Sequence, residues 1–149
     1  INPRIHFKSN GEKKQTNDSA INISGGNDMD RFSNIWIEGN KIRNITSNFS
    51  DRANGIAILN NPGIIALNNE IKDVQGAGIR VFTCCNLRAL DYMNYIINNN
   101  ISNTGRGSLD INNKKVKIET RPSFVPASIY KNRPSKQTWY NYKSNSDSQ

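Results

Sequence analysis

The apolar residues of this chain recur in two registers. In the first, an apolar residue stands three positions before an asparagine, and an isoleucine follows that asparagine after one spacer residue. The asparagines lie 29 and 30 residues apart, a period typical of repeat architectures. From apolar residue to isoleucine, the three units are Ile37, Asn40 and Ile42; Ala66, Asn69 and Ile71; Ile96, Asn99 and Ile101.

The second register begins at a glycine downstream of each asparagine. It reads GIAIL from Gly55, GIRVF from Gly78 and GSLDI from Gly107, with spacings of 23 and 29 residues. Apolar residues alternate with others in each stretch, as in a strand with one buried face. Two short β-rich stretches per unit predict a β-solenoid, in which each coil rises by about 4.8 Å and stacking builds the core. Leucine-rich repeats fit poorly because the sequence has no leucine ladder. A helical solenoid fits poorly because no unit holds two amphipathic helices.

Asparagine is unusually frequent, with 25 among 149 residues. It disfavours helix interiors and accepts the left-handed backbone conformation better than most residues. We therefore expect asparagine at the corners of the coils, where the chain turns sharply. Stacked amides can also hydrogen-bond from coil to coil. We interpret Asn40, Asn69 and Asn99 as a structural ladder rather than as ligand-binding groups.

The stretches from Gly55 to Phe82 and from Tyr95 to Ile111 together resemble the right-handed parallel β-helix of the pectate-lyase-like superfamily. That superfamily includes polysaccharide lyases, glycoside hydrolases, mannuronan epimerases and phage tailspike depolymerases. The resemblance covers roughly residues 33–120 and transfers no catalytic motif residue by residue. It implies an all-β fold, a short right-handed parallel β-helix of about four coils. Since the chain begins with Ile1, we expect a processed product or a fragment of a longer protein.

We divide the chain into three parts: an N-terminal partial coil or capping segment (1–32), the β-helix coils (33–120), and a C-terminal capping or partner-docking segment with a disordered tail (121–149). Three prolines break the repeat pattern in the last part. Its apolar residues could cover the open end of the solenoid or dock on another subunit. They are Phe124, Val125, Ile129, Trp139, Tyr140 and Tyr142.

The first strand of each coil is apolar at both side-chain parities, as at Trp36 and Ile37, Ile65 and Ala66, and Tyr95 and Ile96. A solvated sheet face alternates with polar residues, so we expect this face to be covered. A packed terminal segment or a neighbouring subunit could cover it. The tailspike resemblance implies the second, a homo-oligomer such as a trimer, or other chains of a larger assembly.

The formal net charge of +8 favours an anionic partner. Lysine and arginine are scattered rather than gathered on a helix face, which disfavours nucleic acid. The one histidine, His6, and the adjacent Cys84 and Cys85 give no metal-ligand pattern, so the sequence predicts no metal and no cofactor. No apolar run reaches the roughly 18 residues of a membrane-spanning helix.

Candidate chemistry lies outside the ladder. We expect Ala57, Arg80 and Asp110 to form an outward column, with Arg80 and Asp110 on adjacent coils. Asp51 and Asp73, in the turns ahead of the glycine-led strands, are the candidate acid and base, since glycosidases place two carboxylates about the scissile bond. A lyase needs cations around a uronate and a base for its α-proton. The candidate substrate-binding residues are Arg52, Arg80, Arg88, Arg106 and Asp110.

The leading hypothesis is a carbohydrate-directed β-helix of tailspike or depolymerase type that binds or cleaves an acidic surface polysaccharide. Its location would be a virion, at the phage tail, or the extracellular or cell surface. The alternative is a non-catalytic structural or adhesin module of a virion or cell surface. The sequence does not decide between a polysaccharide lyase, a glycoside hydrolase and a chain without catalysis.

Overall fold

The computed structural model describes residues 19–24, 32–47, 53–83, 93–112, 116–122 and 125–133. These residues form eleven β-strands and one short helix. The strands are β1 (Ile21–Ser24), β2 (Ile35–Glu38), β3 (Lys41–Ile45), β4 (Ile56–Leu59), β5 (Ile64–Leu67), β6 (Glu70–Val74), β7 (Ile79–Phe82), β8 (Asn94–Ile97), β9 (Asn100–Thr104), β10 (Leu109–Ile111) and β11 (Val116–Glu119). The helix is α1 (Ala127–Tyr130).

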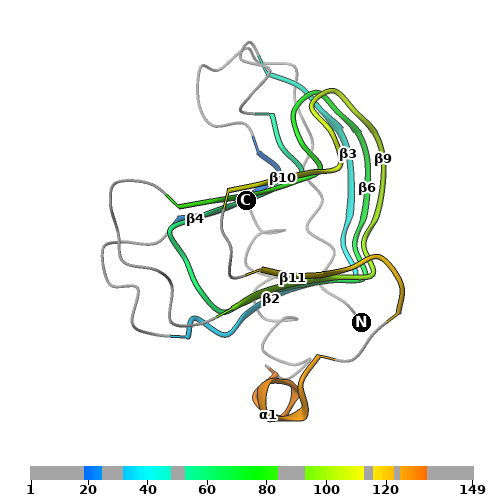
Figure 1. Cartoon of the computed structure of the whole chain (residues 1–149). Coiled ribbons are helices and arrows are strands. Elements are labelled where there is room, and N and C mark those ends of the chain that lie inside the picture. The colour runs from blue at the N-terminus through cyan, green and yellow to red at the C-terminus, as the bar shows by residue number, and fades with distance from the viewer. Residues whose placement is uncertain are drawn as a thin grey trace, which may run out of the picture.

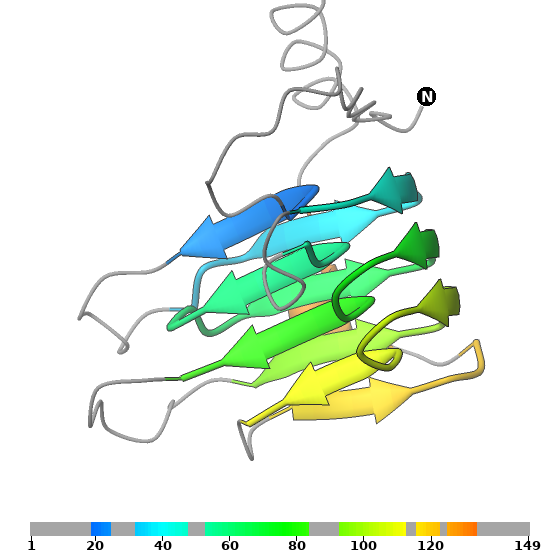
Figure 2. The ribbon, with the colours of Figure 1, turned by 90° about the horizontal axis from the view of Figure 1, so that it is seen from above.

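The strands stack in three parallel sheets. Sheet A runs β1-β4-β7-β10, sheet B runs β2-β5-β8-β11, and sheet C runs β3-β6-β9. Successive strands of the chain visit the three sheets in turn, so one circuit makes one coil. Figure 1 looks along the stack and shows the three sides of the coils, and Figure 2 shows the strands piled one above another. The predicted all-β parallel β-helix of about four coils is confirmed.

Like residues stack on like residues in the core. The register places Ile21 on Ile56, Ile56 on Ile79, and Ile79 on Leu109. Ile56 and Ile79 are fully buried, whereas Leu109 in the last coil is only partly buried. Burial of one such side chain stabilises by roughly 1.5–3 kcal/mol. The inner coils therefore contribute most of the hydrophobic stabilisation.

Each complete coil has three strands, not the two predicted from the sequence. The apolar stretch before each ladder asparagine and the isoleucine after it belong to different strands, which meet at the corner between sheets B and C. The left-handed residue at this corner is the one just before the ladder asparagine: Gly39 (φ 68°), Asn68 (φ 55°) and Asn98 (φ 52°). We expected one asparagine both to turn the chain and to hydrogen-bond between coils. In the structure the residue before it makes the turn, and the ladder asparagine makes the hydrogen bonds.

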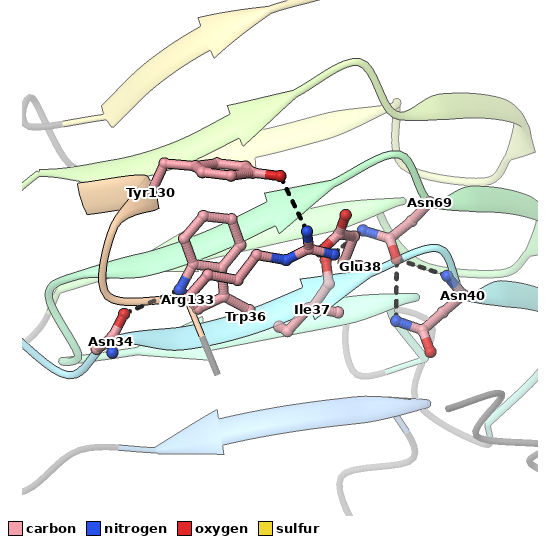
Figure 3. A network of polar contacts seen from close by, with 8 residues as sticks. All are labelled: Asn34, Trp36, Ile37, Glu38, Asn40, Asn69, Tyr130 and Arg133. Atoms are coloured by element: carbon pink, nitrogen blue, oxygen red, sulfur yellow. Dashed lines mark hydrogen bonds and ion pairs between the residues drawn. The ribbon is translucent and has the colours of Figure 1, made fainter. Parts of the chain in front are cut away.

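The ladder asparagines hydrogen-bond from coil to coil, as predicted. Asn69 Oδ1 accepts from both the backbone N–H and the amide Nδ2 of Asn40, each at 3.0 Å, and Figure 3 shows this pair. Asn99 Oδ1 accepts the same two bonds from Asn69, at 3.0 and 2.9 Å. Asn69 Nδ2 also donates to the carbonyl of Ile37 at 2.8 Å. A buried amide with all these partners fixes the rise and register between coils.

The outer face of sheet B carries a second core. Ile65, Leu67, Tyr95 and Ile97 are buried there, against Val125 and, on its edges, Phe32, Trp36 and Ile129. Helix α1 lies on this outer side in Figure 1. The face is therefore covered, as expected, by a terminal segment of the same chain.

The direction of this cover differs from one expectation. Val125 and Ile129 pack on the side of the stack and not over its open end, because the outward apolar residues of sheet B gain from burial there. Phe124, Trp139, Tyr140 and Tyr142 lie outside the described residues. A homo-oligomer stays a prediction.

The first described strand, β1, lies within the predicted N-terminal segment 1–32 and pairs with β4. In the part of the chain that the structure describes, no helix has the length and apolar character needed to cross a membrane.

Replacing the middle rung of the ladder should destabilise the whole stack. Asn69→Ala removes an acceptor and two donors and leaves the Asn40 N–H and the Ile37 carbonyl without their described partner. We expect the free energy of unfolding to fall by about 3 kcal/mol, measured by urea denaturation. Asn100→Ala, which replaces an exposed asparagine on β9, the strand that pairs with β6, is the control and should change it by under about 0.5 kcal/mol. Equal losses in both variants would contradict the ladder.

Candidate functional site

The outer face of sheet A carries a column of aligned side chains. The register places Asn22 beside Ala57, Ala57 beside Arg80, and Arg80 beside Asp110. Their strand neighbours point into the core, as the alternation of buried and half-exposed residues in β7 shows. The predicted outward column of Ala57, Arg80 and Asp110 is confirmed.

Arg80 is held by two neighbours on this face. Its Nε lies 3.6 Å from Asp110 Oδ2 on the next coil. Its guanidinium carbon lies 4.9 Å from the ring centroid of Phe82, two residues along the same strand. The two charged side chains are 31% and 55% exposed. The guanidinium is thus oriented by a carboxylate and an aromatic ring, and part of the side chain is exposed to solvent.

A hollow of about 210 Å³ lies beside this arginine. Ala57, Leu59 and Phe82 give it an apolar floor, while the polar side chains come from Arg80 and from residues of the two preceding coils, Ser19, Asn22 and Asn54. Ligand sites commonly combine an apolar lining with a few placed polar groups. A sugar has apolar C–H faces and a rim of hydroxyls, so this lining suits a sugar ring.

Asp73 lies on sheet C, away from this face. It stacks between Asn44 and Asn103, and all three have left-handed backbones, with φ of 57°, 59° and 50°. Its Oδ1 accepts a hydrogen bond from Asn103 Nδ2 at 2.5 Å. Asp73 therefore fills a corner position that asparagine takes on the neighbouring coils.

The remaining predicted site residues are not brought to one place by the described structure. The Arg106 N–H donates to the Gly76 carbonyl at 3.1 Å, so Arg106 and Asp73 belong to different columns. Asp51, Arg52 and Arg88 lie outside the described residues. Among the described strands of sheet A, Asp110 is the one acidic side chain. Within the described ranges, no group of three or more His, Cys, Asp or Glu side chains could hold a metal ion.

Two features of the surface were not predicted. Phe82 lies two residues after Arg80 on the same strand and so shares its outward face, and this parity is the signal in the sequence that indicates it. A second hollow of about 790 Å³ lies between sheet B and the C-terminal segment. The two-sided apolar pattern of sheet B indicated a cover but could not indicate that the cover leaves a space.

The three stacked parallel sheets define a parallel β-helix. A family model described as a right-handed β-helix region matches residues 5–133, and the chain belongs to this family. The match also gives the handedness of the coils. Searches of curated proteins and of solved structures found no match.

The Arg80–Asp110 pair should orient the arginine rather than stabilise the fold. Because both side chains are partly exposed, Asp110→Asn should lower the free energy of unfolding by less than about 1 kcal/mol. Ile79→Ala, next to Arg80 but fully buried, should lower it by about 3 kcal/mol. Chemical denaturation of both variants checks this. A loss in Asp110→Asn as large as that in Ile79→Ala would show that the pair supports the stack.

Proposed function

We propose that this chain is a carbohydrate-directed β-helix that binds an acidic polysaccharide across the outer face of sheet A. The arrangement of Arg80 between Asp110 and Phe82 carries this proposal. A guanidinium matches the geometry of a carboxylate and can donate two parallel hydrogen bonds to it. Phe82 and Leu59 supply apolar contact for a sugar ring beside that charge.

The long-range electrostatics support the same class of ligand. The chain carries a formal net charge of +8, which attracts polyanions and speeds their association. A uronate-containing polysaccharide combines negative charge with sugar rings, whereas nucleic acid would call for lysine and arginine gathered on one groove or helix face, and these residues are scattered along the sequence. An acidic glycan therefore fits both the charge and the lining.

Binding without cleavage fits the described residues better than catalysis. A glycosidase needs two carboxylates about 5–9.5 Å apart. The described strands of sheet A carry one carboxylate, Asp110, and Asp73 is bonded to Asn103 on another sheet. The β-helix family supports a carbohydrate-related or structural role in general. We extend the proposal to a chain of tailspike or depolymerase type, which would act on a virion or at the extracellular or cell surface.

A purely structural or adhesin module is the second candidate. It is favoured by Asp73, because this residue stands in a column of left-handed asparagines where a structural role accounts for it. This candidate predicts that no acidic glycan binds to sheet A.

Glycan binding to the purified chain tests the proposal. Calorimetry should show binding of oligogalacturonate that weakens with salt, and no comparable binding of neutral dextran. Arg80→Gln removes the guanidinium that would bind a carboxylate of the ligand, and Phe82→Ala removes the contact of the ring with the sugar. Each should weaken binding by about tenfold or more. Arg43→Gln is the matched control, since it removes an exposed arginine from sheet C and should leave affinity within about twofold.

Two results would count against the proposal. Equal affinity for dextran would remove the role of charge, and wild-type affinity in Arg80→Gln would move the site elsewhere. Release of reducing ends or unsaturated uronates, abolished by Asp51→Asn or Asp73→Asn, would instead show that the chain cleaves its ligand.

A further inference from the structure

The larger hollow, of about 790 Å³, lies on the outer side of sheet B, away from the face of sheet A. Its floor is the edge of sheet B and the corner beside it, with Glu38, Leu67, Asn68 and Asn98. Its wall is the C-terminal segment, through residues including Val125 and Tyr130. A volume in this range suits a small organic ligand.

Arg133 fixes the wall of this hollow to the first coil, as Figure 3 shows. Its Nη2 lies 2.7 Å from Glu38 Oε2, and its Nη1 donates to the Tyr130 hydroxyl at 3.0 Å. The guanidinium carbon lies 5.8 Å from the ring centroid of Trp36 and 5.5 Å from that of Tyr130. These two rings meet edge to face at 5.8 Å.

One further bond ties the same segment down. Asn34 Nδ2 donates to the Asn132 carbonyl at 2.8 Å, and the Asn34 amide is itself oriented because its Oδ1 accepts from Trp36 Nε1 at 2.9 Å. The wall is therefore anchored at its end to β2 and to the residue before it. An anchored wall gives a preformed site, which spares a ligand the cost of ordering it.

The lining of the hollow combines amides with apolar surface. Asn98 Nδ2 donates to Asn68 Oδ1 at 2.8 Å. This bond uses one N–H of one amide and one lone pair of the other, so the pair keeps the capacity to donate and to accept toward a ligand. Leu67 and Val125 lie buried beside the amides, and Tyr130 presents a half-exposed ring.

The lining offers little to a charged ligand. Glu38 is already paired with Arg133, and Lys131 is exposed, so that solvent and salt screen its charge. An uncharged ligand avoids the desolvation of an ionic group. The ligand chemistry that fits is thus uncharged, with an amide group, a small apolar group and a ring face.

We propose that this hollow binds an uncharged sugar carrying acetamido groups, such as an oligomer of N-acetylglucosamine. The acetamido amide pairs with Asn68 and Asn98, its methyl group contacts Leu67 and Val125, and the sugar ring lies against Tyr130. The site is separate from the face that takes the acidic glycan, and it does not rest on that function.

The test measures binding of three trisaccharides to the full chain by calorimetry. The N-acetylglucosamine trimer should bind, while the glucose trimer of the same linkage, which lacks the acetamido groups, should bind at least about tenfold more weakly. The glucosamine trimer, which carries positive charge in place of the acetamido groups, should also bind more weakly. Equal binding of all three would overturn the proposal, as would no binding of the acetylated trimer.

Variants locate the site. Asn98→Gly removes the amide while keeping a residue that accepts the left-handed backbone, and it should weaken binding by about tenfold. Asn103→Gly is the matched control, since it removes a left-handed asparagine from sheet C, and its affinity should be unchanged. Arg133→Gln frees the wall, so it should abolish most binding while the circular dichroism of the strands persists.

Arg80→Gln separates the two sites. It should leave binding of the acetylated trimer unchanged even though it weakens oligogalacturonate binding. Loss of both ligands in this variant would place the acetylated sugar on sheet A and overturn the second site. Unchanged affinity in both Asn98→Gly and Arg133→Gln would overturn it as well.

Discussion

The buried amide of one asparagine per coil is the contact on which the rest of the structure depends. Asn69 joins the coil before it through Asn40 and Ile37 and the coil after it through Asn99. Each bond is made in a site where an unmet donor or acceptor would be costly, so the coils can stack at only one rise and one register. A slip of one residue would place every core isoleucine on the outer surface.

The columns of surface side chains follow this register. Arg80 meets Asp110 because both stand one position after the first core residue of their strands. The same logic brings Asn68 beside Asn98 at the next corner. Surface groups that are 30 residues apart in sequence thus become neighbours without any local motif. A column can change from an apolar to a charged side chain between adjacent coils without disturbing the core, as it does from Ala57 to Arg80.

The fold could be predicted from the sequence, whereas the candidate site could be predicted only in part. Asn-x-Ile and the glycine-led alternation were enough to predict stacked parallel strands and the outward position of Arg80 and Asp110. They did not reveal the third strand, because the apolar residues, the ladder asparagine and the following isoleucine form one sequence unit, whereas the left-handed residue before the asparagine separates two strands. They also gave no sign of the space under the C-terminal segment, since that space depends on how the segment of Arg133 lies on sheet B.

The Arg133 anchor has a mechanical consequence for the stack. It joins a residue that follows the last coil to Glu38 in the first coil, while Val125 packs on the coils between them. In an open solenoid, the terminal coils can fray one at a time because each contacts only its neighbours. Here one segment, which includes Val125 and Arg133, connects the last coil to the first along the outer face of sheet B. We therefore expect loss of the last coil to disturb the first, so that the stack unfolds cooperatively rather than coil by coil.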